Sequence, residues 1–458
     1  MKERTASSYS GRHFGHYKAA AHSEYLSEVH ARTLSLITKT GATPGRWSRG
    51  LSVMLEKIAG VALVTKLRAI LLMEADFNCH NRLIFGDRMM KLARENGLVP
   101  EEIYSEKGKT AEDAILQQVL LFDIARQLRR PLLVASVDAA QCYDRIAHAA
   151  AALTLRAYKV RQSSVTSMLA PIQTMEYYLR TGYGESKTYS GGAEDPKQGA
   201  CQGNTAAPAT WQQISSVLIS AQKRAGHGIQ VVTPITKKTR KQVGIMFVDD
   251  TNLWEGLGED DDELTVMKKG QESINSWGNN LLAVGGKLRP EKCSYTIHRM
   301  RPTKGGEWEY VQEKLVTPLS EKTLVDTELD DLWEDMDEEE LDELEPASAG
   351  LTVPLANGDA AAIKKLSNND AEENLGLKVQ PDGCTSRHIS ALKDKVEEWT
   401  SDVDGSQLPA RAVWQSYTQQ LWTRMKYGLG VCTTLLDELE NVLGSSDFYL
   451  TSRLGVVR

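Results

Sequence analysis

Apolar residues recur at helical spacing in several segments of the chain. In these segments they stand three or four positions apart, so that they share one face of a helix. Most of the segments stop at glycine or at a cluster of basic residues, both common at helix C-termini. The pattern predicts helices over residues 19–40, 82–97, 111–130, 145–160, 206–226, 262–284, 388–403 and 410–429.

Shorter and more continuous apolar runs predict strands between these helices. The run "PLLVASVD" (131–138) is the clearest, and "ALVTKLRAILL" (62–72) is another. Residues 227–256 predict three strands around one basic and one acidic turn, and 287–298 predict a returning strand. The resulting order βα, α, ββ, αβ favours a mixed α+β fold over a doubly wound sheet.

One segment interrupts this pattern and changes the meaning of the net charge. Residues 326–345 hold 13 Asp and Glu and no Lys or Arg, which is typical of a disordered insert. The whole chain carries a formal charge of −7, but outside this run it holds 54 basic and 48 acidic side chains. The remainder is therefore mildly basic, which permits a phosphate-binding surface without requiring one.

Length and composition exclude some classes of protein. The 458 residues suffice for two or three folding units, and 41% of them are apolar. No apolar run reaches the length of a membrane span, and the first residues lack the apolar core of a signal peptide. The six cysteines are scattered without zinc-ligand spacing, so we expect reduced thiols in an intracellular protein, either nuclear or cytoplasmic.

Two adjacent carboxylates, Asp249 and Asp250, stand inside the apolar stretch "VGIMFVDDTNLWEG". Two such charges about 5 Å apart repel by roughly 3 kcal/mol at an effective dielectric constant near 20. A hairpin turn would expose both acids to water, and a bound divalent cation would neutralise them. The stretch alone leaves both interpretations open.

A third carboxylate, Asp138, ends the strand 131–138. Three carboxylates from neighbouring strands can hold two divalent ions about 4 Å apart, an arrangement that promotes phosphoryl transfer. Mg²⁺ is the expected metal because it prefers oxygen ligands, and Mn²⁺ is an alternative. Strand alternation would point Asp249 and Asp250 to opposite faces, so we expect Asp249 to be the principal ligand of the pair. Asp144, six residues after Asp138, is interpreted as a helix N-cap.

The order of three motifs resembles the palm of reverse transcriptases, especially those of non-LTR retrotransposons. The first motif is "SVDAAQCYD", with Asp138, Tyr143 and Asp144 at its key positions. The second is "GACQGNTAAP" (199–208), which contains Gln202 and Gly203, and the third is "FVDD" (247–250). "KLRAI" (66–70) is similar to the fingers strand of the family, and "GGKLRPEKC" (285–293) to the element after the palm acids.

This resemblance implies a right-hand polymerase of α+β class, with fingers, an antiparallel palm sheet backed by helices, and a C-terminal helical thumb-like region. The boundaries that we expect are residues 1–130 for an N-terminal extension and fingers, 131–316 for the palm, 317–363 for the acidic insert and 364–458 for the thumb-like region. In the last of these, Trp399, Trp414 and Trp422 are expected in the core because they recur at helical spacing.

The resemblance also implies the chemistry and the roles. A primer 3′-hydroxyl would attack the α-phosphate of a deoxynucleoside triphosphate opposite an RNA template, so the expected partners are template, DNA primer and nucleotide. Asp138, Asp249 and Asp250 would hold two Mg²⁺ ions. Lys66 and Arg68 would bind the triphosphate, with solvated strand residues as the alternative. Tyr143 would exclude a 2′-hydroxyl, Gln202 and Gly203 would position the template base and the nucleotide, and Lys292 would protonate pyrophosphate or simply be a surface lysine.

Two other functions remain open at this stage. The chain could be a degenerate retroelement remnant that binds nucleic acid or protein without chemistry. It could also be an RNA-templated RNA polymerase, although Tyr143 at the sugar position disfavours ribonucleotides. The retained acids favour the active RNA-directed DNA polymerase.

Overall fold

The computed structural model describes 8–57, 60–61, 63, 66–181, 184–191, 197–233, 235–303, 306–311, 350–368, 370, 372–432 and 434–454. The acidic run 326–345 lies outside the described residues. Within them, no helix combines the length and the apolar character that crossing a membrane requires.

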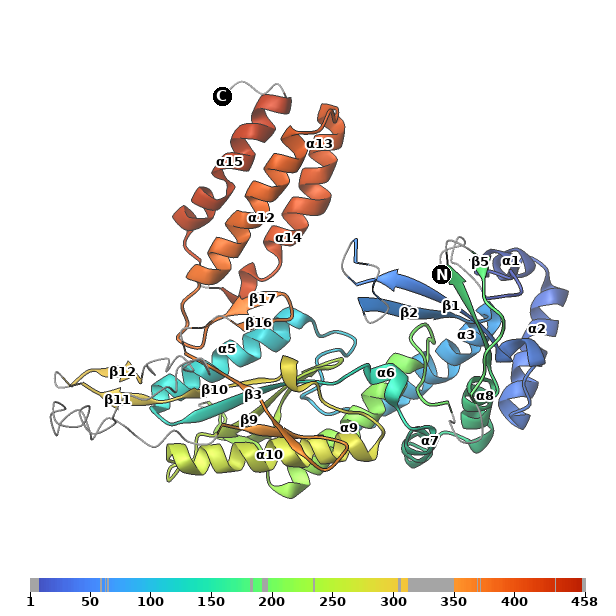
Figure 1. Cartoon of the computed structure of the whole chain (residues 1–458), viewed down its shortest axis with the longest axis horizontal. Coiled ribbons are helices and arrows are strands. Elements are labelled where there is room, and N and C mark those ends of the chain that lie inside the picture. Colours follow the sequence, from blue (N-terminus) through green and yellow to red (C-terminus); the bar gives the residue numbers. More distant parts are fainter. Residues whose placement is uncertain are drawn as a thin grey trace, which may run out of the picture.

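A five-stranded sheet occupies the centre of the molecule (Figure 1). Its order is β15-β10-β3-β9-β8, and all neighbours are antiparallel except the edge pair β10–β15. The strands are β3 (Leu132–Asp138), β8 (Gly244–Phe247), β9 (Asp250–Gly256), β10 (Ser294–His298) and β15 (Lys364–Leu366). The sheet therefore joins segments that lie far apart in the sequence.

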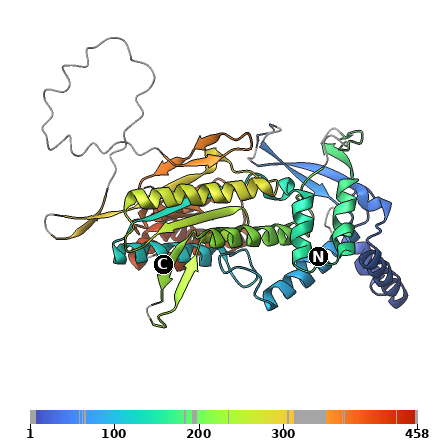
Figure 2. The same cartoon turned by 90° about the horizontal axis from the view of Figure 1, so that it is seen from below.

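Both faces of this sheet are covered, because strand alternation sends apolar side chains to each side. Leu133, Ala135 and Val137 pack with the two long helices α9 (Ala207–Ala225) and α10 (Glu263–Ala283), which lie side by side in Figure 2. On the opposite face, Leu132 and Val134 pack with α5 (Ala111–Leu128). The continuous apolar run 131–138 is thus a strand buried on both sides.

A second sheet lies beside the first and has the order β2-β1-β4-β5 (Figure 1). Its strands are β1 (Arg49–Glu56), β2 (Leu67–Leu72), β4 (Glu176–Thr181) and β5 (Gly184–Glu185). Two of these strands come from residues 131–316, so this sheet joins the segments that we expected to be the fingers and the palm. The surrounding elements are α1 (Phe14–Ala20), α2 (Glu24–Thr40), η1 (Gly45–Ser48), α3 (Ala75–Asn81), η3 (Arg82–Met89), α4 (Met90–Glu95), α6 (Cys142–Arg145), α7 (His148–Ala157) and α8 (Gln162–Gln173).

The C-terminal part is a helical bundle that projects from the side of the central five-stranded sheet (Figure 1). Its core holds Leu392, Val396, Trp399 and Val413. Trp414 and Trp422 are 47% and 42% exposed, so the expected core packing holds for Trp399 but is wrong for these two. The bundle elements are α12 (Ser386–Asp404), α13 (Ala410–Ser416), η6 (Tyr417–Leu421), α14 (Trp422–Lys426), η7 (Leu429–Val431) and α15 (Leu436–Leu454).

Small hairpins correct several further expectations. Residues 227–256 form four strands instead of three, because β6 (Ile229–Val232) pairs with β7 (Thr239–Gln242) in a separate sheet. Residues 350–363 belong to the expected disordered insert, yet they form the hairpin β13 (Thr352–Pro354) and β14 (Ala360–Ala362) with Val353 fully buried.

The segment 364–385 was expected to be part of the helical region but is not helical, since it contains β15, β16 (Glu372–Asn374) and β17 (Leu377–Val379). The remaining elements are η4 (Pro290–Lys292), β11 (Met300–Pro302) and β12 (Trp308–Tyr310).

The fold class expected from the sequence is confirmed. Antiparallel sheet and helices are mixed along the chain, the central sheet is backed by helices, and the C-terminal part is largely helical.

Candidate active site

Asp138 and Asp250 face each other across the central sheet. Asp138 is the last residue of β3, Asp250 is the first residue of β9, and the register makes them direct partners. Directly opposed residues on neighbouring strands direct their side chains to the same face. The fold therefore brings the first carboxylate beside the later pair, as the sequence predicted.

Asp249 lies in the tight turn that joins β8 to β9. Phe247 and Asp250 form the last strand pair, which leaves Val248 and Asp249 as the turn residues. Trp211 on α9 donates a 2.6 Å hydrogen bond from Nε1 to the carbonyl oxygen of Val248. Val248 has φ of 60°, an uncommon conformation for a β-branched residue and one that is often found at functional sites.

This geometry corrects the argument that favoured Asp249. Strand alternation does not apply to Asp249, because it stands in a turn, and it is Asp250 that lies directly opposite Asp138. The hairpin turn that the sequence left open is present, and binding of a divalent cation at these acids stays a prediction. Which acid would bind metal more strongly stays a prediction.

The three carboxylates influence one another electrostatically. Partial burial, and then the negative charges of Asp249 and Asp138, raise the pKa of Asp250 to about 6. Burial also raises the pKa of Asp249, with a further contribution from Asp138. Asp250 is the most exposed of the three acids, and the charges of Asp249 and Asp138 still repel its ionised form. A positive charge placed among these groups would relieve that repulsion.

Two basic side chains already supply positive charge to Asp138. The Arg289 Nε lies 2.9 Å from Asp138 Oδ1, and the Lys292 Nζ lies 3.5 Å from Asp138 Oδ2. The Arg289 contact is an ion pair without hydrogen-bond alignment, since both atoms are buried and have no hydrogen-bond partner in the part of the chain that the structure describes. The structure places the Lys292 ammonium group at this carboxylate, and its expected role at the leaving pyrophosphate stays a prediction.

The donor set fits a hard divalent cation, although the side chains do not converge on one point. Within the described residues, no three His, Cys, Asp or Glu side chains form a ready-made metal site. Asp138 Oδ1 is nevertheless a buried carboxylate oxygen that accepts no hydrogen bond from any described residue and has only the ion pair with Arg289. Such an oxygen, next to two further carboxylates, matches the ligand preference of Mg²⁺ and Mn²⁺.

The loop of residues 199–203 is held against two other elements by its glycines. A Cβ at Gly203 would come within 2.2 Å of the Leu71 carbonyl oxygen on β2, and one at Gly199 within 2.5 Å of the Asp144 carbonyl oxygen on α6. The Leu71 N–H also donates a 2.8 Å hydrogen bond to the carbonyl oxygen of Gln202. The close approach that these two glycines permit is therefore to neighbouring elements of the chain, and the expected role of Gly203 at the nucleotide stays a prediction.

Asp144 and Tyr143 have different surroundings on α6. Asp144 Oδ1 accepts a 2.9 Å hydrogen bond from the Gln202 N–H, while Ala147 is the N-cap of the following helix. The interpretation of Asp144 as a helix cap is therefore wrong. Tyr143 lines a small cavity of about 70 Å³ with Trp211 and Val248, next to the Asp249 turn, and burial raises the pKa of its hydroxyl.

Comparison with known protein families identifies the family of this chain. Residues 57–322, more than half of the chain, match the family model described as reverse transcriptase (RNA-dependent DNA polymerase). The chain belongs to the reverse transcriptase family.

Comparisons of this reverse transcriptase with curated protein sequences and with solved structures show less similarity. No curated protein sequence matches it. The solved structure of apo telomerase from Candida tropicalis, truncated from the C-terminal domain, is 14% identical and has a TM-score of 0.36. That match covers 59% of this chain and 55% of the telomerase chain, so it spans little more than half of the solved structure.

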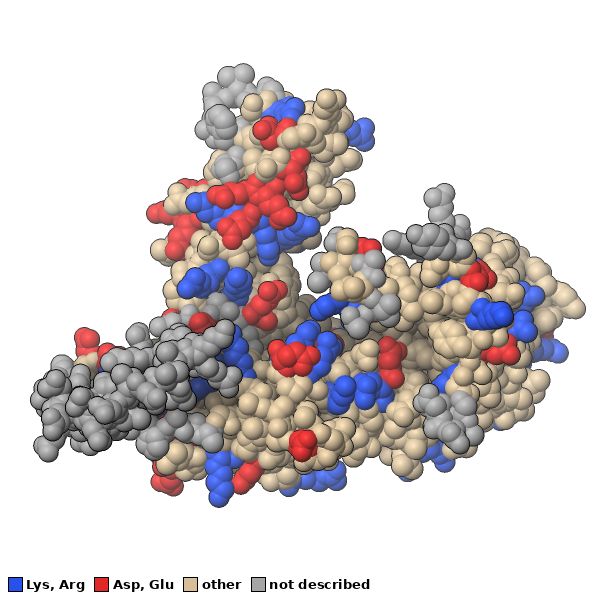
Figure 3. All heavy atoms as spheres, viewed as in Figure 1, with Lys and Arg blue, Asp and Glu red and all other residues tan. Residues whose placement is uncertain are grey.

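The two basic residues expected to bind a triphosphate lie at the start of β2, in the second sheet of this reverse transcriptase. Arg68 is on β2, opposite Leu55 of β1, and Lys66 immediately precedes the strand. Both side chains are exposed. On the face of the molecule drawn in Figure 3, Lys and Arg side chains form separate groups interspersed with Asp and Glu. Whether Lys66 and Arg68 bind a substrate stays a prediction.

Sequence reasoning missed Arg289 and Trp211. Arg289 stands in "KLRPEKC", where only the lysine had an expected role, and Trp211 was counted only as part of a helix. The spacing of Trp211, one helical turn after Pro208, places it near the second motif, and this is the one signal that could have identified it.

Proposed function

We propose that the chain is an RNA-directed DNA polymerase of a retroelement, which extends a primer 3′-hydroxyl with deoxynucleotides opposite an RNA template. The proposal depends above all on the juxtaposition of Asp138 and Asp250 across β3 and β9, with Asp249 in the adjoining turn. Membership of the reverse transcriptase family supports the same chemistry.

In this proposal Asp138, Asp249 and Asp250 would hold two divalent metal ions. When bound, such ions favour attack by a hydroxyl and stabilise the leaving oxygen. The chain itself positions the acids: β3 and β9 fix Asp138 and Asp250, and Trp211 fixes the turn that carries Asp249. Arg289 and Lys292 limit the repulsion among the acids before any metal binds.

The other residues would select the nucleotide. Tyr143 lies next to the turn of Asp249 and would exclude a ribose 2′-hydroxyl by contact. The loop 199–203, tied to both β2 and α6, would keep Gln202 at a fixed distance from the acids. Lys66 and Arg68 would bind the triphosphate from the exposed β1–β2 hairpin.

Primer extension tests the proposal. Protein with oligo(dT)-primed poly(rA), dTTP and Mg²⁺ should extend the primer, and both Asp249→Ala and Asp250→Ala should abolish extension. Asp260→Ala, an exposed acid shortly after β9, is the matched control and should extend normally. Wild-type protein that stays inactive across templates and with both Mg²⁺ and Mn²⁺ would support the degenerate remnant.

Sugar selection is tested separately with Tyr143→Ala. This variant should incorporate ribonucleotides at least about tenfold better relative to deoxynucleotides than the wild type does, because the steric contact is removed. Equal discrimination by both proteins would contradict the role of Tyr143.

A further inference from the structure

Helix α2 carries a row of exposed apolar side chains at the end of the molecule away from the central sheet (Figure 1 and Figure 2). Tyr25, Val29 and Leu36 follow one another at spacings of four and seven residues, so they share one face of the helix, and Leu26 lies at its edge. Tyr25 is 73% and Leu36 is 61% exposed, and the other two are exposed as well. We call these four residues the α2 stripe. A contiguous row of exposed large apolar side chains is typical of an interaction surface.

The other side of α2 fixes the helix to the molecule. Ile37 is buried and Leu34 half-buried in a cluster that also contacts Tyr177 of β4. The Ser163 hydroxyl on α8 donates a 2.7 Å hydrogen bond to the carbonyl oxygen of Thr38. The helix therefore presents the α2 stripe from a fixed position.

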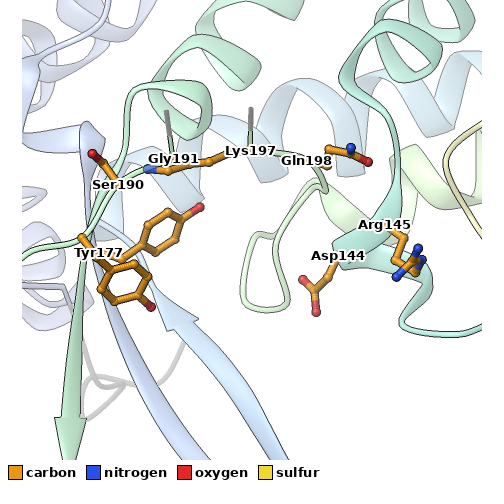
Figure 4. Close-up of a pocket in the computed structure, with 8 residues that line it drawn as sticks. Asp144, Arg145, Tyr177, Ser190, Gly191, Lys197 and Gln198 are labelled. Atoms are coloured by element: carbon orange, nitrogen blue, oxygen red, sulfur yellow. The ribbon is translucent and has the colours of Figure 1, made fainter. Parts of the chain in front are cut away.

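The α2 stripe is separate from the features that the proposed function uses. Tyr177 also lines a cavity of about 430 Å³ together with Asp144 and Lys197 (Figure 4), but no residue of α2 lines it. The match to the reverse transcriptase model begins at residue 57, after α2. Polymerase chemistry therefore gives no reason for this row of apolar side chains.

The charges of α2 are divided between its two halves. Glu24 and Glu28 lie in the first half, and Arg32 and Lys39 lie in the second. Their spacings of four, four and seven residues place all four along one edge of the stripe. The Arg32 Nη2 lies 2.5 Å from Glu28 Oε1, but both side chains are exposed and can also meet charges from outside. A second α2 that runs antiparallel would oppose acidic and basic halves, whereas a parallel one would oppose like charges.

A second copy of this chain matches this pattern. A two-fold axis through the middle of the stripe would place Tyr25 against Leu36 of the second copy, and Leu36 against its Tyr25. The same alignment would bring Glu28 beside Arg32 of the second copy. Such an interface is closed, because both copies use the same surface, and the association would stop at two chains.

We propose that α2 is a self-association surface, through which two copies of this chain form an antiparallel, two-fold symmetric dimer. The stripe is about 16 Å long, since Tyr25 and Leu36 are three helical turns apart. A contact limited to one such helix pair lies below the roughly 1,200 Å² of stable interfaces, so the dimer is reversible and forms at micromolar concentrations. The proposal does not depend on polymerase activity.

Sedimentation equilibrium of the full chain between about 1 and about 100 µM tests the proposal. The weight-average mass of the wild type should rise with concentration from 50.7 kDa toward twice that value. Leu36→Glu and Tyr25→Glu each place a charge in the stripe and should weaken association at least about tenfold. Both residues are exposed, so the variants should fold. Leu264→Glu, at a leucine of α10 that is equally exposed but outside the stripe, is the control and should associate as the wild type does.

Charge reversal tests the antiparallel arrangement. Glu28→Lys would oppose two positive side chains in the dimer and should weaken association about fivefold. Adding Arg32→Glu to this variant restores the complementarity and should restore association. Glu397→Lys removes a similar exposed pair, with Lys393 on α12, and makes the same change in net charge, so it should have no effect.

Three results would overturn the proposal. One is a wild-type chain that stays monomeric up to about 100 µM. Another is a dimer that neither Leu36→Glu nor Tyr25→Glu weakens, because its interface would then lie elsewhere. The third is unchanged association of Glu28→Lys, which the antiparallel arrangement does not allow.

Discussion

At the scale of single residues, the acidic residues of the candidate active site were easier to predict from the sequence than the basic residues beside them. Asp138, Asp249 and Asp250 are unusual in apolar strands, so their positions alone draw notice. Arg289 stands in a polar loop, where an arginine is ordinarily solvated. Only the folded chain shows that this loop returns to β3, where the Arg289 N–H donates to the carbonyl oxygen of Asp138 at 3.0 Å. Pairings of this kind depend on tertiary contacts that no local pattern encodes.

The Arg289–Asp138 ion pair predicts a measurable effect on metal affinity. A divalent cation at Asp138 must compete with the guanidinium, so Arg289→Gln should bind Mn²⁺ about fivefold more tightly than the wild type. Free Mn²⁺ in a titration can be measured by electron paramagnetic resonance without any substrate. Arg301→Gln, which removes a partner of the exposed Glu309, is the control and should not change the affinity. Weaker binding in Arg289→Gln would instead show that Arg289 orients the carboxylate for the metal.

Glu255 predicts a pH dependence of stability that is separate from the catalytic acids. Its buried carboxylate accepts a 3.0 Å hydrogen bond from the Gly228 N–H, yet burial raises its pKa to about 7. The unfolded chain ionises Glu near pH 4.3, so between about pH 4 and 7 the folded state retains a proton that the unfolded state has lost. Stability from this group is therefore lost as pH rises through that window, by up to about 3 kcal/mol.

Thermal unfolding of Glu255→Gln against the wild type measures this effect. The variant does not titrate, so it should gain stability relative to the wild type as pH rises from 4 to 7, and the difference should be constant above pH 8. Glu398→Gln, at an exposed position of α12, should show no such trend. A pH-independent difference for Glu255→Gln would contradict the assignment.

At the scale of elements, helices and the buried central strand were predictable, whereas short strands were not. The periodicity of residues 263–283 and the apolar run 132–138 are long enough to be unambiguous. The segment 239–247 looked like one strand, but its first half pairs with β6 and its second half with β9. At Gly244 a Cβ would come within 1.9 Å of the Asn252 carbonyl oxygen, so only glycine permits this change of partner.

The packing of the loop 199–203 predicts that adding one methyl group at Gly203 strongly lowers the free energy of unfolding. Gly203 has φ of 124°, and a Cβ there would lie 2.2 Å from the backbone of β2, which cannot move aside. Gly203→Ala should lower the free energy of unfolding by about 1–3 kcal/mol more than Gly108→Ala does. Gly108 also has positive φ, at 92°, but a Cβ there meets no atom within 4 Å. Thermal or urea unfolding provides the comparison, and equal losses in both variants would show that the contact with β2 is not maintained.

At the scale of the whole molecule, the order of the helices and strands along the chain was predictable, but which distant segments share a sheet was not. In the sheet β2-β1-β4-β5, the strand β4 from the middle of the chain pairs with β1. In the central sheet, β15 from the C-terminal part pairs with β10. The bundle is joined to α5 by hydrogen bonds from Arg126 Nη1 to the Asp382 carbonyl oxygen and from the Gly428 N–H to Glu112. Such pairings between distant segments carry no local signal, so boundaries drawn from composition separated residues that share a sheet.

The charge distribution of the whole chain predicts how nucleic-acid binding depends on salt. The run 326–345 concentrates 13 acidic residues in a chain that is otherwise mildly basic. If this negative charge competes with phosphates for basic side chains, the competition acts over a Debye length of about 8 Å at physiological salt. Replacing each Asp by Asn and each Glu by Gln in this run changes the formal net charge from −7 to about +6. The neutralised chain should bind a single-stranded oligonucleotide several-fold more tightly in about 50 mM salt. The gain should vanish near 0.5 M, because counterions then screen both the acidic run and the phosphates.

The control is a chain with the same run in shuffled order, which keeps the charge and should bind as the wild type does. If neutralisation leaves the low-salt affinity unchanged, the run does not act on the nucleic-acid surface. If the shuffled chain alone binds differently, the order of its residues matters more than its charge.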